Sequence, residues 1–196
     1  MAHLPDIVAA NTSGIHRAAK ILLAGGVIAV PTETLYGLAA LALDPVAVEV
    51  VARLKGRPGD NPFPVLVRDI AMVEGLVREV PEAAARLMRA HWPGPLTLVL
   101  PARAGLPARL VGAGGGVGLR HSPDPVVAAL MALIGQPLTA TSANLSGAPP
   151  ATTAQQARLP GLELVLDDGP RDAPASTVVS LLEGAPRILR QGPVDI

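Results

Sequence analysis

Three short segments of the sequence gather side chains suited to binding phosphate groups or small polar ligands. They are Pro31–Gly37 (PTETLYG), Lys55–Pro62 (KGRPGDNP) and Thr139–Gly147 (TATSANLSG). In the second segment a lysine and an arginine at positions 55 and 57 could clamp a polyphosphate, the first as a compact charge and the second as a bidentate fork. The hydroxyl-rich third segment offers small donors and backbone N–H groups that suit a phosphate or an adenine edge.

Each segment also has a purely structural interpretation. Pro31–Gly37 could be a turn after a buried strand, with threonines capping a helix and Tyr36 filling the core. Lys55–Pro62 could be a solvated helix end, where cations meet the helix dipole favourably. Ser, Asn and Gly in the third segment are also ordinary turn residues. Taken one at a time, the segments leave both interpretations open.

Other polar residues extend or limit this picture. Arg120 ends an apolar strand and is a natural partner for a substrate carboxylate, although such an arginine often only extends its charge to solvent. Ser142 is not expected to be a hydrolase nucleophile, because G-x-S-x-G is absent and all four histidines precede it. Gly112–Gly118 matches neither the dinucleotide nor the P-loop pattern, so we expect a flexible turn or lid there.

Composition excludes several classes of protein. The 196 residues carry no cysteine, which rules out disulfide frameworks and thiolate metal sites, and no His/carboxylate spacing predicts protein-bound zinc or iron. A net charge of +0 with one Trp, one Tyr and one Phe argues against a general nucleic-acid-binding surface. No apolar run approaches the roughly 18–20 residues of a membrane-spanning helix, and the N-terminus does not resemble a signal peptide. We therefore expect a cytoplasmic protein with no membrane partner.

Short apolar runs alternate with amphipathic stretches along the chain, which predicts an α/β fold in a single domain covering residues 1–196. Expected helices begin at Thr12 or Ser13, at Asp44-Pro45, at Pro81-Glu82 and at Ser122-Pro123-Asp124, and end near residues 24, 54, 91 and 134. Expected strands cover residues 27–30, 64–67, 96–100, 117–119, 137–140, 162–166, 177–181 and 187–189.

In this order and spacing, the motifs resemble the YrdC-like threonylcarbamoyl-AMP synthase family over about residues 14–193. The resemblance rests on PTETLYGL, KGRPGDNP, WPGPLTLVL, TSANLSG, STVV and ILR, which begin at residues 31, 55, 92, 141, 176 and 188. It implies a twisted mixed sheet, parallel and antiparallel, flanked by helices and enclosing a large concave cavity. It also implies a nucleotidyltransferase that converts L-threonine, bicarbonate and ATP, with Mg²⁺, to threonylcarbamoyl-AMP and pyrophosphate.

The resemblance assigns the site residues as well. ATP is expected at Lys55, Arg57, Asn61, Ser142, Asn144 and Arg190, with the first two catalytic, and threonine at Thr32, Thr34, Arg120 and Ser176. The product would pass to a threonylcarbamoyl transferase complex that modifies adenosine 37 of tRNAs reading ANN codons. The alternative is a paralogue of the same fold that binds double-stranded RNA or a nucleotide without making this product.

The sequence departs from the family pattern at three places, one of which is Gly116, where the family usually has a hydroxyl-bearing residue. Leu66 stands where many members have a histidine, and Ser122 and Asp124 stand where they often have a proline and a histidine. One polar contact to threonine is therefore expected to be missing or replaced in this chain.

Overall fold

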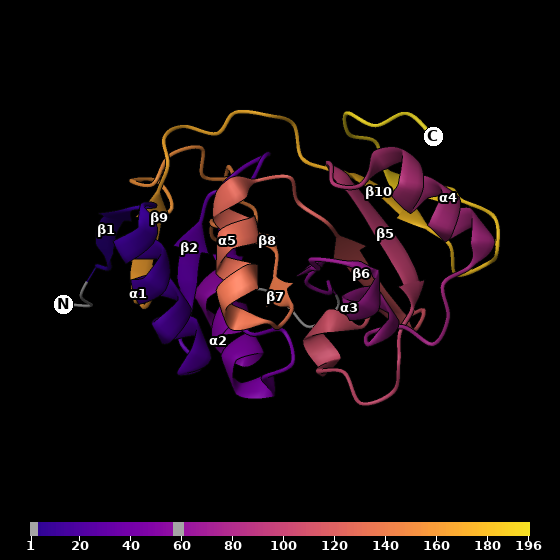
Figure 1. Cartoon of the computed structure of the whole chain (residues 1–196), viewed down its shortest axis with the longest axis horizontal. Helices are drawn as coiled ribbons and strands as arrows, with labels where there is room; N and C mark the ends of the chain where they lie inside the picture. Colours follow the sequence, from indigo (N-terminus) through magenta and orange to yellow (C-terminus); the bar gives the residue numbers. More distant parts are fainter. Residues whose placement is uncertain (1–3, 57–60) are drawn as a thin grey trace.

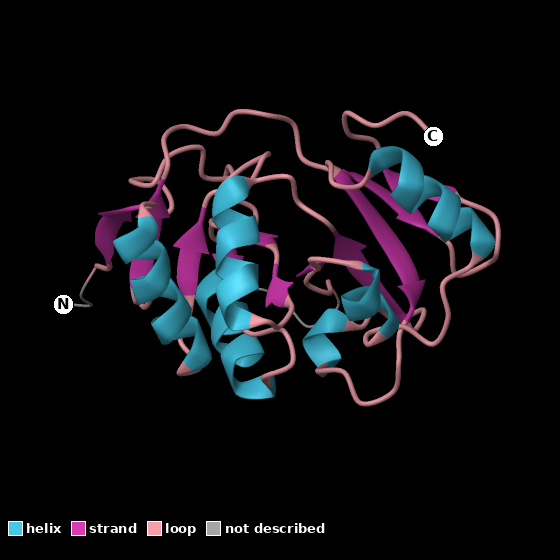
Figure 2. Cartoon of the chain, in the orientation of Figure 1, coloured by secondary structure: helices cyan, strands magenta, loops and turns pink. Residues whose placement is uncertain are grey.

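The computed structural model describes residues 4–56 and 61–196, and in them two mixed sheets stand side by side (Figures 1 and 2). The five-stranded sheet has the order β1 (Asp6–Ala9), β9 (Leu164–Asp167), β2 (Ile28–Val30), β3 (Gly37–Ala39), β8 (Thr141–Ser142). The six-stranded sheet has the order β11 (Arg187–Arg190), β10 (Thr177–Ser180), β5 (Leu96–Pro101), β6 (Gly116–Arg120), β4 (Val65–Leu66), β7 (Leu138–Thr139). The helices are α1 (Thr12–Leu23), α2 (Pro45–Lys55), α3 (Ile70–Glu74), α4 (Glu82–His91), α5 (Pro125–Ile134) and the 3-10 turn η1 (Ala108–Leu110).

The α/β class and the mixture of parallel and antiparallel pairs are confirmed. The strands divide between two sheets, however, where the sequence predicted one. The chain steps from one sheet to the other between β7 and β8, and the Thr139 hydroxyl donates to Leu38 O of β3 at 3.1 Å. The two sheets therefore adjoin at this point. Side chains from both sheets can reach the space next to the junction.

Helices α2 and α5 begin at capping residues, as expected, whereas α4 begins after Pro81 with no side-chain cap. Asp44 and Asp124 accept backbone N–H groups at the starts of α2 and α5, each with a proline in the first turn. For α1 the prediction of Thr12 or Ser13 is wrong by one or two positions: Asn11 is the cap, and its Oδ1 accepts from Gly14 N at 3.0 Å. An asparagine side chain serves this role as well as a hydroxyl does, which is why the sequence did not separate them.

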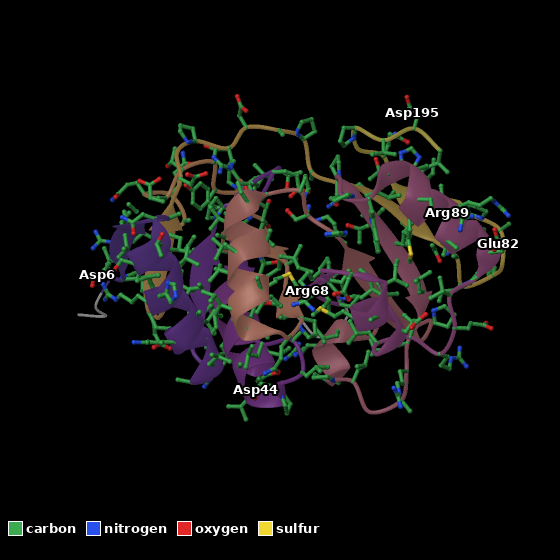
Figure 3. All side chains as sticks on the ribbon, viewed as in Figure 1. Asp6, Asp44, Arg68, Glu82, Arg89 and Asp195 are labelled. Atoms are coloured by element: carbon green, nitrogen blue, oxygen red, sulfur yellow. The ribbon has the colours of Figure 1, made fainter. Side chains whose placement is uncertain are left out.

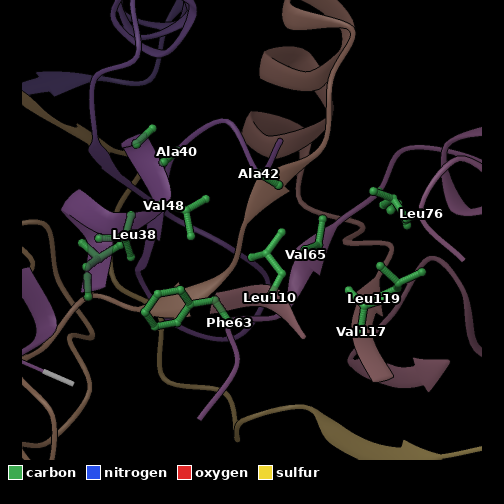
Figure 4. Close-up of a cluster of buried hydrophobic side chains, with 14 of the residues drawn as sticks. Leu38, Ala40, Ala42, Val48, Phe63, Val65, Leu76, Leu110, Val117 and Leu119 are labelled. Atoms are coloured by element: carbon green, nitrogen blue, oxygen red, sulfur yellow. The ribbon is translucent and has the colours of Figure 1, made fainter. Parts of the chain in front are cut away.

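Alternate residues of the five-stranded sheet serve two hydrophobic clusters. Ile28 and Val30 pack with α1 and α5 on one face, whereas Ala29 packs with α2 on the other. The cluster that contains Ala29 continues without a break into the six-stranded sheet. Figure 4 shows Phe63 among Leu38, Val65 and Leu110, which come from both sides of the junction. This core of Ala, Val and Leu side chains, with Tyr36, Phe63 and Met88 among them, holds the two sheets in a fixed relation.

Several elements were missed by the sequence prediction. They are β1, β3, α3 and the short β8, and each spans five residues or fewer. Strands this short obtain their hydrogen bonds from distant partners, such as β9 for β1, so local periodicity carries little trace of them.

Charged side chains lie mainly over the outside of the molecule, as the labelled Asp6, Asp44, Glu82, Arg89 and Asp195 illustrate (Figure 3). Across the described ranges 4–56 and 61–196, no helix combines the length and apolar character that crossing a membrane requires.

The first turn of α1 lies so close to the end of β1 that only glycine fits at position 14. A Cβ there would stand 2.1 Å from Ala9 O. We expect Gly14→Ala to lower the free energy of unfolding by about 1–3 kcal/mol, because one of two backbone segments must move. Urea denaturation measures this, with Gly75→Ala as the control, since a Cβ at Gly75 would meet its nearest atom, Met72 O, at 3.4 Å. Equal stabilities of the two variants would contradict the close approach.

Candidate functional site

A cavity of about 670 Å³ opens between the two sheets. Its walls come from β2, β3 and β8 of one sheet and from β4, β5, β6, β10 and β11 of the other. Apart from Lys55, every sequence-predicted site residue that the structure describes lines this cavity, namely Thr32, Thr34, Asn61, Arg120, Ser142, Asn144, Ser176 and Arg190. Arg57, the remaining predicted residue, lies outside the described residues. The side chains fall into three contact groups.

The first group joins the end of α2 to β8 and the turn after it. Lys55 is only 4% exposed, and its ammonium donates to Ser142 O at 2.6 Å, Asn144 Oδ1 at 2.9 Å and Asn144 O at 3.0 Å. The Ser142 hydroxyl donates to Asn144 Oδ1 at 2.6 Å and stands 3.4 Å from the ammonium. Because α2 ends here at Gly56 in a left-handed conformation, the helix delivers Lys55 directly beneath the turn. One buried cation thus fixes two polar side chains at the cavity wall.

The second group surrounds Arg120 at the end of β6. Arg120 is 7% exposed, and its Nη1 donates to Thr34 Oγ1 at 3.3 Å and lies 3.4 Å from Glu33 Oε1. Thr34 Oγ1 is in turn 3.0 Å from Thr32 Oγ1. Burial lowers the pKa of Arg120 from its ordinary value, while Glu33 opposes the shift. An arginine pKa begins so high that the group stays cationic. The result is a charged fork with two hydroxyls beside it.

The third group joins Arg190, the last residue of β11, to Ser176, the residue that precedes β10. Arg190 donates to Ser176 O from Nε at 3.0 Å and from Nη2 at 2.8 Å, and Nη2 also lies 3.1 Å from Ser176 Oγ. The Ser176 hydroxyl is 2.9 Å from that of Thr97 on β5. Thr97 also lines the cavity and was not singled out from the sequence. The signal that could have identified it is a lone hydroxyl within the apolar strand LTLVL.

Glycines keep the floor of the cavity open. Gly112, Gly114, Gly116 and Gly118 all line it, which places this glycine-rich segment beside the candidate site. Gly116 and Gly118 belong to β6, and a Cβ at Gly116 would come within 2.7 Å of Val99 and 2.9 Å of Leu182. The end of the segment is therefore packed strand, as the expected strand at 117–119 predicted, and the strand begins one residue earlier, at Gly116.

Tyr36 fits the structural interpretation of the PTETLYG segment. It is fully buried and its hydroxyl donates to Gly169 O at 2.8 Å, while burial raises its pKa. Its backbone accepts from Ala143 N at 2.8 Å, which ties the threonine-rich segment to the turn that holds Asn144. The same seven residues thus provide both core packing and cavity hydroxyls.

The donors at this site suit anions better than a resident metal ion. Within the described part of the chain, no three His, Cys, Asp or Glu side chains are grouped so that they could hold a metal. The cavity instead presents the guanidinium groups of Arg120 and Arg190 together with hydroxyl and amide groups. Such a set can bind a carboxylate and phosphates, and can orient two ligands within one enclosed space.

Comparisons with known proteins agree on one family. The family Sua5_yciO_yrdC, described as "Telomere recombination", matches residues 20–192. A relative from Mycobacterium tuberculosis is 42% identical over 189 residues, which are 94% of this chain and 87% of its own. The threonylcarbamoyl-AMP synthase of Pyrococcus abyssi is 39% identical over 182 residues, which are 91% of this chain and 54% of its own. This chain therefore spans about half the length of some relatives and most of others.

Solved structures give the same answer. P. abyssi Sua5 complexed with L-threonine superposes with a TM-score of 0.87 at 39% identity, covering 91% of this chain and 54% of its own. Escherichia coli YciO superposes with a TM-score of 0.87 at 26% identity and covers 97% of both chains. The two-sheet architecture is therefore shared with a short protein and with the corresponding part of a longer one.

The Lys55 cluster leads to a stability prediction. We expect Lys55→Met to lower the free energy of unfolding by about 3 kcal/mol, because the buried oxygens of Ser142 and Asn144 lose their charged donor. Urea denaturation measures the change, and Lys20→Met is the matched control because Lys20 is exposed on α1. If the two substitutions cost the same, the ammonium does not hold the turn.

Proposed function

This chain belongs to the Sua5/YciO/YrdC family, and on that premise we propose that it is an L-threonylcarbamoyladenylate synthase. The reaction joins L-threonine, bicarbonate and ATP into threonylcarbamoyl-AMP and releases pyrophosphate. The observation that carries the proposal is the single cavity, in which a buried arginine fork with two hydroxyls shares the walls with the turn that Lys55 holds. One end suits an amino-acid carboxylate and the other suits phosphates.

At the amino-acid end we assign the carboxylate of threonine to Arg120. A guanidinium matches a carboxylate with two parallel hydrogen bonds, and the low exposure of Arg120 strengthens both of them. The hydroxyls of Thr32, Thr34 and Ser176 can hold the remaining polar atoms of the amino acid. A neutral threonine amine can then attack the carbon of CO₂, so that the C–N bond forms as one C=O π bond opens and the nitrogen releases a proton to give a carbamate. Bicarbonate supplies the CO₂ by losing hydroxide.

At the nucleotide end we assign the phosphates of ATP to Arg57, Ser142 and Asn144, with Asn61 and Arg190 as further contacts. Lys55 belongs to this set through the turn that it holds, since its ammonium lies behind Ser142 and Asn144 and does not line the cavity. A carbamate oxygen attacks the α-phosphorus, the new P–O bond forms, and pyrophosphate leaves. Such a transfer needs in-line positioning and neutralised charge more than a covalent nucleophile. Mg²⁺ enters as part of the ATP substrate and neutralises part of the phosphate charge. The cations and amide groups of the cavity bind the phosphate oxygens that Mg²⁺ does not contact.

An enclosed cavity also suits the chemistry of the intermediates. A carbamate decomposes in water, and a mixed anhydride of a carbamate and AMP hydrolyses, so both benefit from a site with little water. The apolar part of the wall, which includes Val30, Phe63 and Leu66, serves this purpose. We propose that the product is handed in the cytoplasm to a threonylcarbamoyl transferase acting on adenosine 37 of tRNA.

The test of this function is pyrophosphate release. We expect release that requires ATP, Mg²⁺, bicarbonate and threonine together, and loss of release in Lys55→Ala and Arg57→Ala. Arg120→Lys keeps the charge and removes the fork, so the KM for threonine should rise about ten- to hundred-fold while the KM for ATP stays within two-fold.

The control for these variants is Arg86→Lys, since Arg86 is an exposed residue of α4 far from the cavity walls. Salt-sensitive binding of double-stranded RNA without any pyrophosphate release would contradict the synthase and favour the binding paralogue. Release that does not depend on bicarbonate would also contradict it.

A further inference from the structure

We propose that Glu33, Ser122, Asp124 and Arg171 form a polar ring behind the threonine site, and that they are positioning residues for Arg120, Thr32 and Thr34. The inference rests on the proposed function and deepens it, because it names what fixes the geometry of the amino-acid end. Among these four, only Glu33 lies in a segment for which the sequence predicted ligand chemistry.

One side of the ring runs from Arg120 to the start of α5. Glu33 contacts the Arg120 guanidinium through Oε1, which lies 3.4 Å from Nη1, and accepts a short hydrogen bond from the Ser122 hydroxyl through Oε2. Ser122 Oγ also accepts from Asp124 N at 3.2 Å. A hydroxyl at position 122 thus joins the carboxylate beside Arg120 to the cap of a helix. Glu33 Oε1 is buried and accepts no hydrogen bond from the described residues, so the ion pair with Arg120 is what balances its charge.

The other side runs from Asp124 back to Thr32. Asp124 Oδ1 caps α5, and its Oδ2 accepts from Arg171 Nη2 at 3.3 Å. Arg171 Nε donates to Thr32 O at 3.0 Å. The circuit closes on the cavity side, where Thr32 Oγ1 meets Thr34 Oγ1, which accepts from Arg120. Every link of the ring joins two atoms that lie 3.4 Å apart or closer.

Arg171 occupies the position from which it can hold two segments at once. It lies in the segment between β9 of one sheet and β10 of the other. The trace that joins these two strands crosses the upper side of Figure 1. Its Nη1 donates to Asp168 O at 2.7 Å and its Nη2 to Asp168 Oδ2 at 2.6 Å, so the crossing segment itself fixes the side chain. All three nitrogens of the Arg171 guanidinium therefore have partners, and this group is held in one orientation. A lysine could not make these contacts together.

The ring is a frame and not a ligand shell. Glu33, Ser122, Asp124 and Arg171 are absent from the cavity wall, whereas Thr32, Thr34 and Arg120 line it. Asp124 is 3% exposed at its side chain and Arg171 is 17% exposed, so solvent screens their contact weakly. Displacement of the frame would move the hydroxyls and the fork relative to each other. Errors of about 1 Å in such geometry can cost as much as a hundred-fold in binding or rate.

The experiment measures ligand binding by calorimetry, with L-threonine and ATP titrated separately into the intact protein. We expect Arg171→Gln to raise the Kd for threonine about ten-fold and to leave the Kd for ATP within two-fold. Asp124→Asn should weaken threonine binding similarly, since an asparagine still caps α5 but no longer carries the charge that holds Arg171. The double variant should bind threonine with a Kd no higher than that of the weaker-binding single variant, because both substitutions remove the same contact.

The matched control is Arg158→Gln. Arg158 also ties distant segments through a backbone carbonyl, with Nε 2.6 Å from Pro5 O, but it does not line the cavity or touch the ring. Its threonine Kd should stay within two-fold of the wild-type value even if its thermal midpoint falls as far as that of Arg171→Gln. The comparison separates a loss of stability from a loss of site geometry.

The outcomes are distinct. Wild-type protein that binds no threonine contradicts the proposed function and the ring with it. Wild-type binding that is unchanged in Arg171→Gln and Asp124→Asn overturns the ring alone. Equal weakening of threonine and ATP binding would show general destabilisation and would also overturn it. If Arg171→Gln does not fold, Asp124→Asn decides, because its helix cap is retained.

Discussion

The burial of one guanidinium between two sheets is the constraint on which the rest of the structure depends. Arg120 ends β6 at 7% exposure, where a cation without partners would cost several kcal/mol. The threonine-rich segment after β2 supplies a carboxylate and a hydroxyl to it, and the adjoining sheets keep those partners within 3.4 Å. The same burial that makes the charge expensive also makes it effective, because a ligand carboxylate arriving there meets little competition from water. The junction of the two sheets therefore both makes the burial of Arg120 possible and creates the site that can bind a carboxylate.

Lys55 is a second buried cation, at the other end of the cavity, and it also needs partners to offset the cost of its burial. A buried ammonium with three acceptors at 2.6–3.0 Å needs no carboxylate, since the oxygens of Ser142 and Asn144 satisfy its donors. A net charge of +0 for the whole chain is compatible with two local cations, because most charged pairs, such as Arg109 with Glu49, lie at the surface. The electric field inside the cavity is thus set by a few buried charged groups and not by the net charge of the whole chain. This is why overall composition said little about anionic ligands.

Much of the architecture could be predicted from local sequence. The caps Asp44 and Asp124, each followed by proline, marked two helix starts correctly, and apolar runs such as LTLVL marked strands. The motifs around Lys55, Ser142 and Arg120 also led to residues that the structure brings to one place. The division into two sheets and the strands β1 and β3 could not be predicted, because their pairing depends on partners far along the chain. Arg171 was missed for the same reason: its contact with Thr32 spans 139 positions, and nothing beside it in the sequence suggests a site.

The departures of this chain from the family pattern become understandable in these terms. Leu66 pairs in register with Arg120 across β4 and β6 and lines the cavity, so the wall beside the fork is apolar at the position where a polar contact was expected. Ser122 and Asp124 do not restore that contact, because neither lines the cavity. They act instead on the far side of Arg120, where Ser122 contacts Glu33 and Asp124 contacts Arg171. A missing ligand contact can be offset by holding the remaining groups more rigidly, since a group that is already oriented loses less entropy when the ligand binds. The three substitutions are therefore better understood together than one at a time.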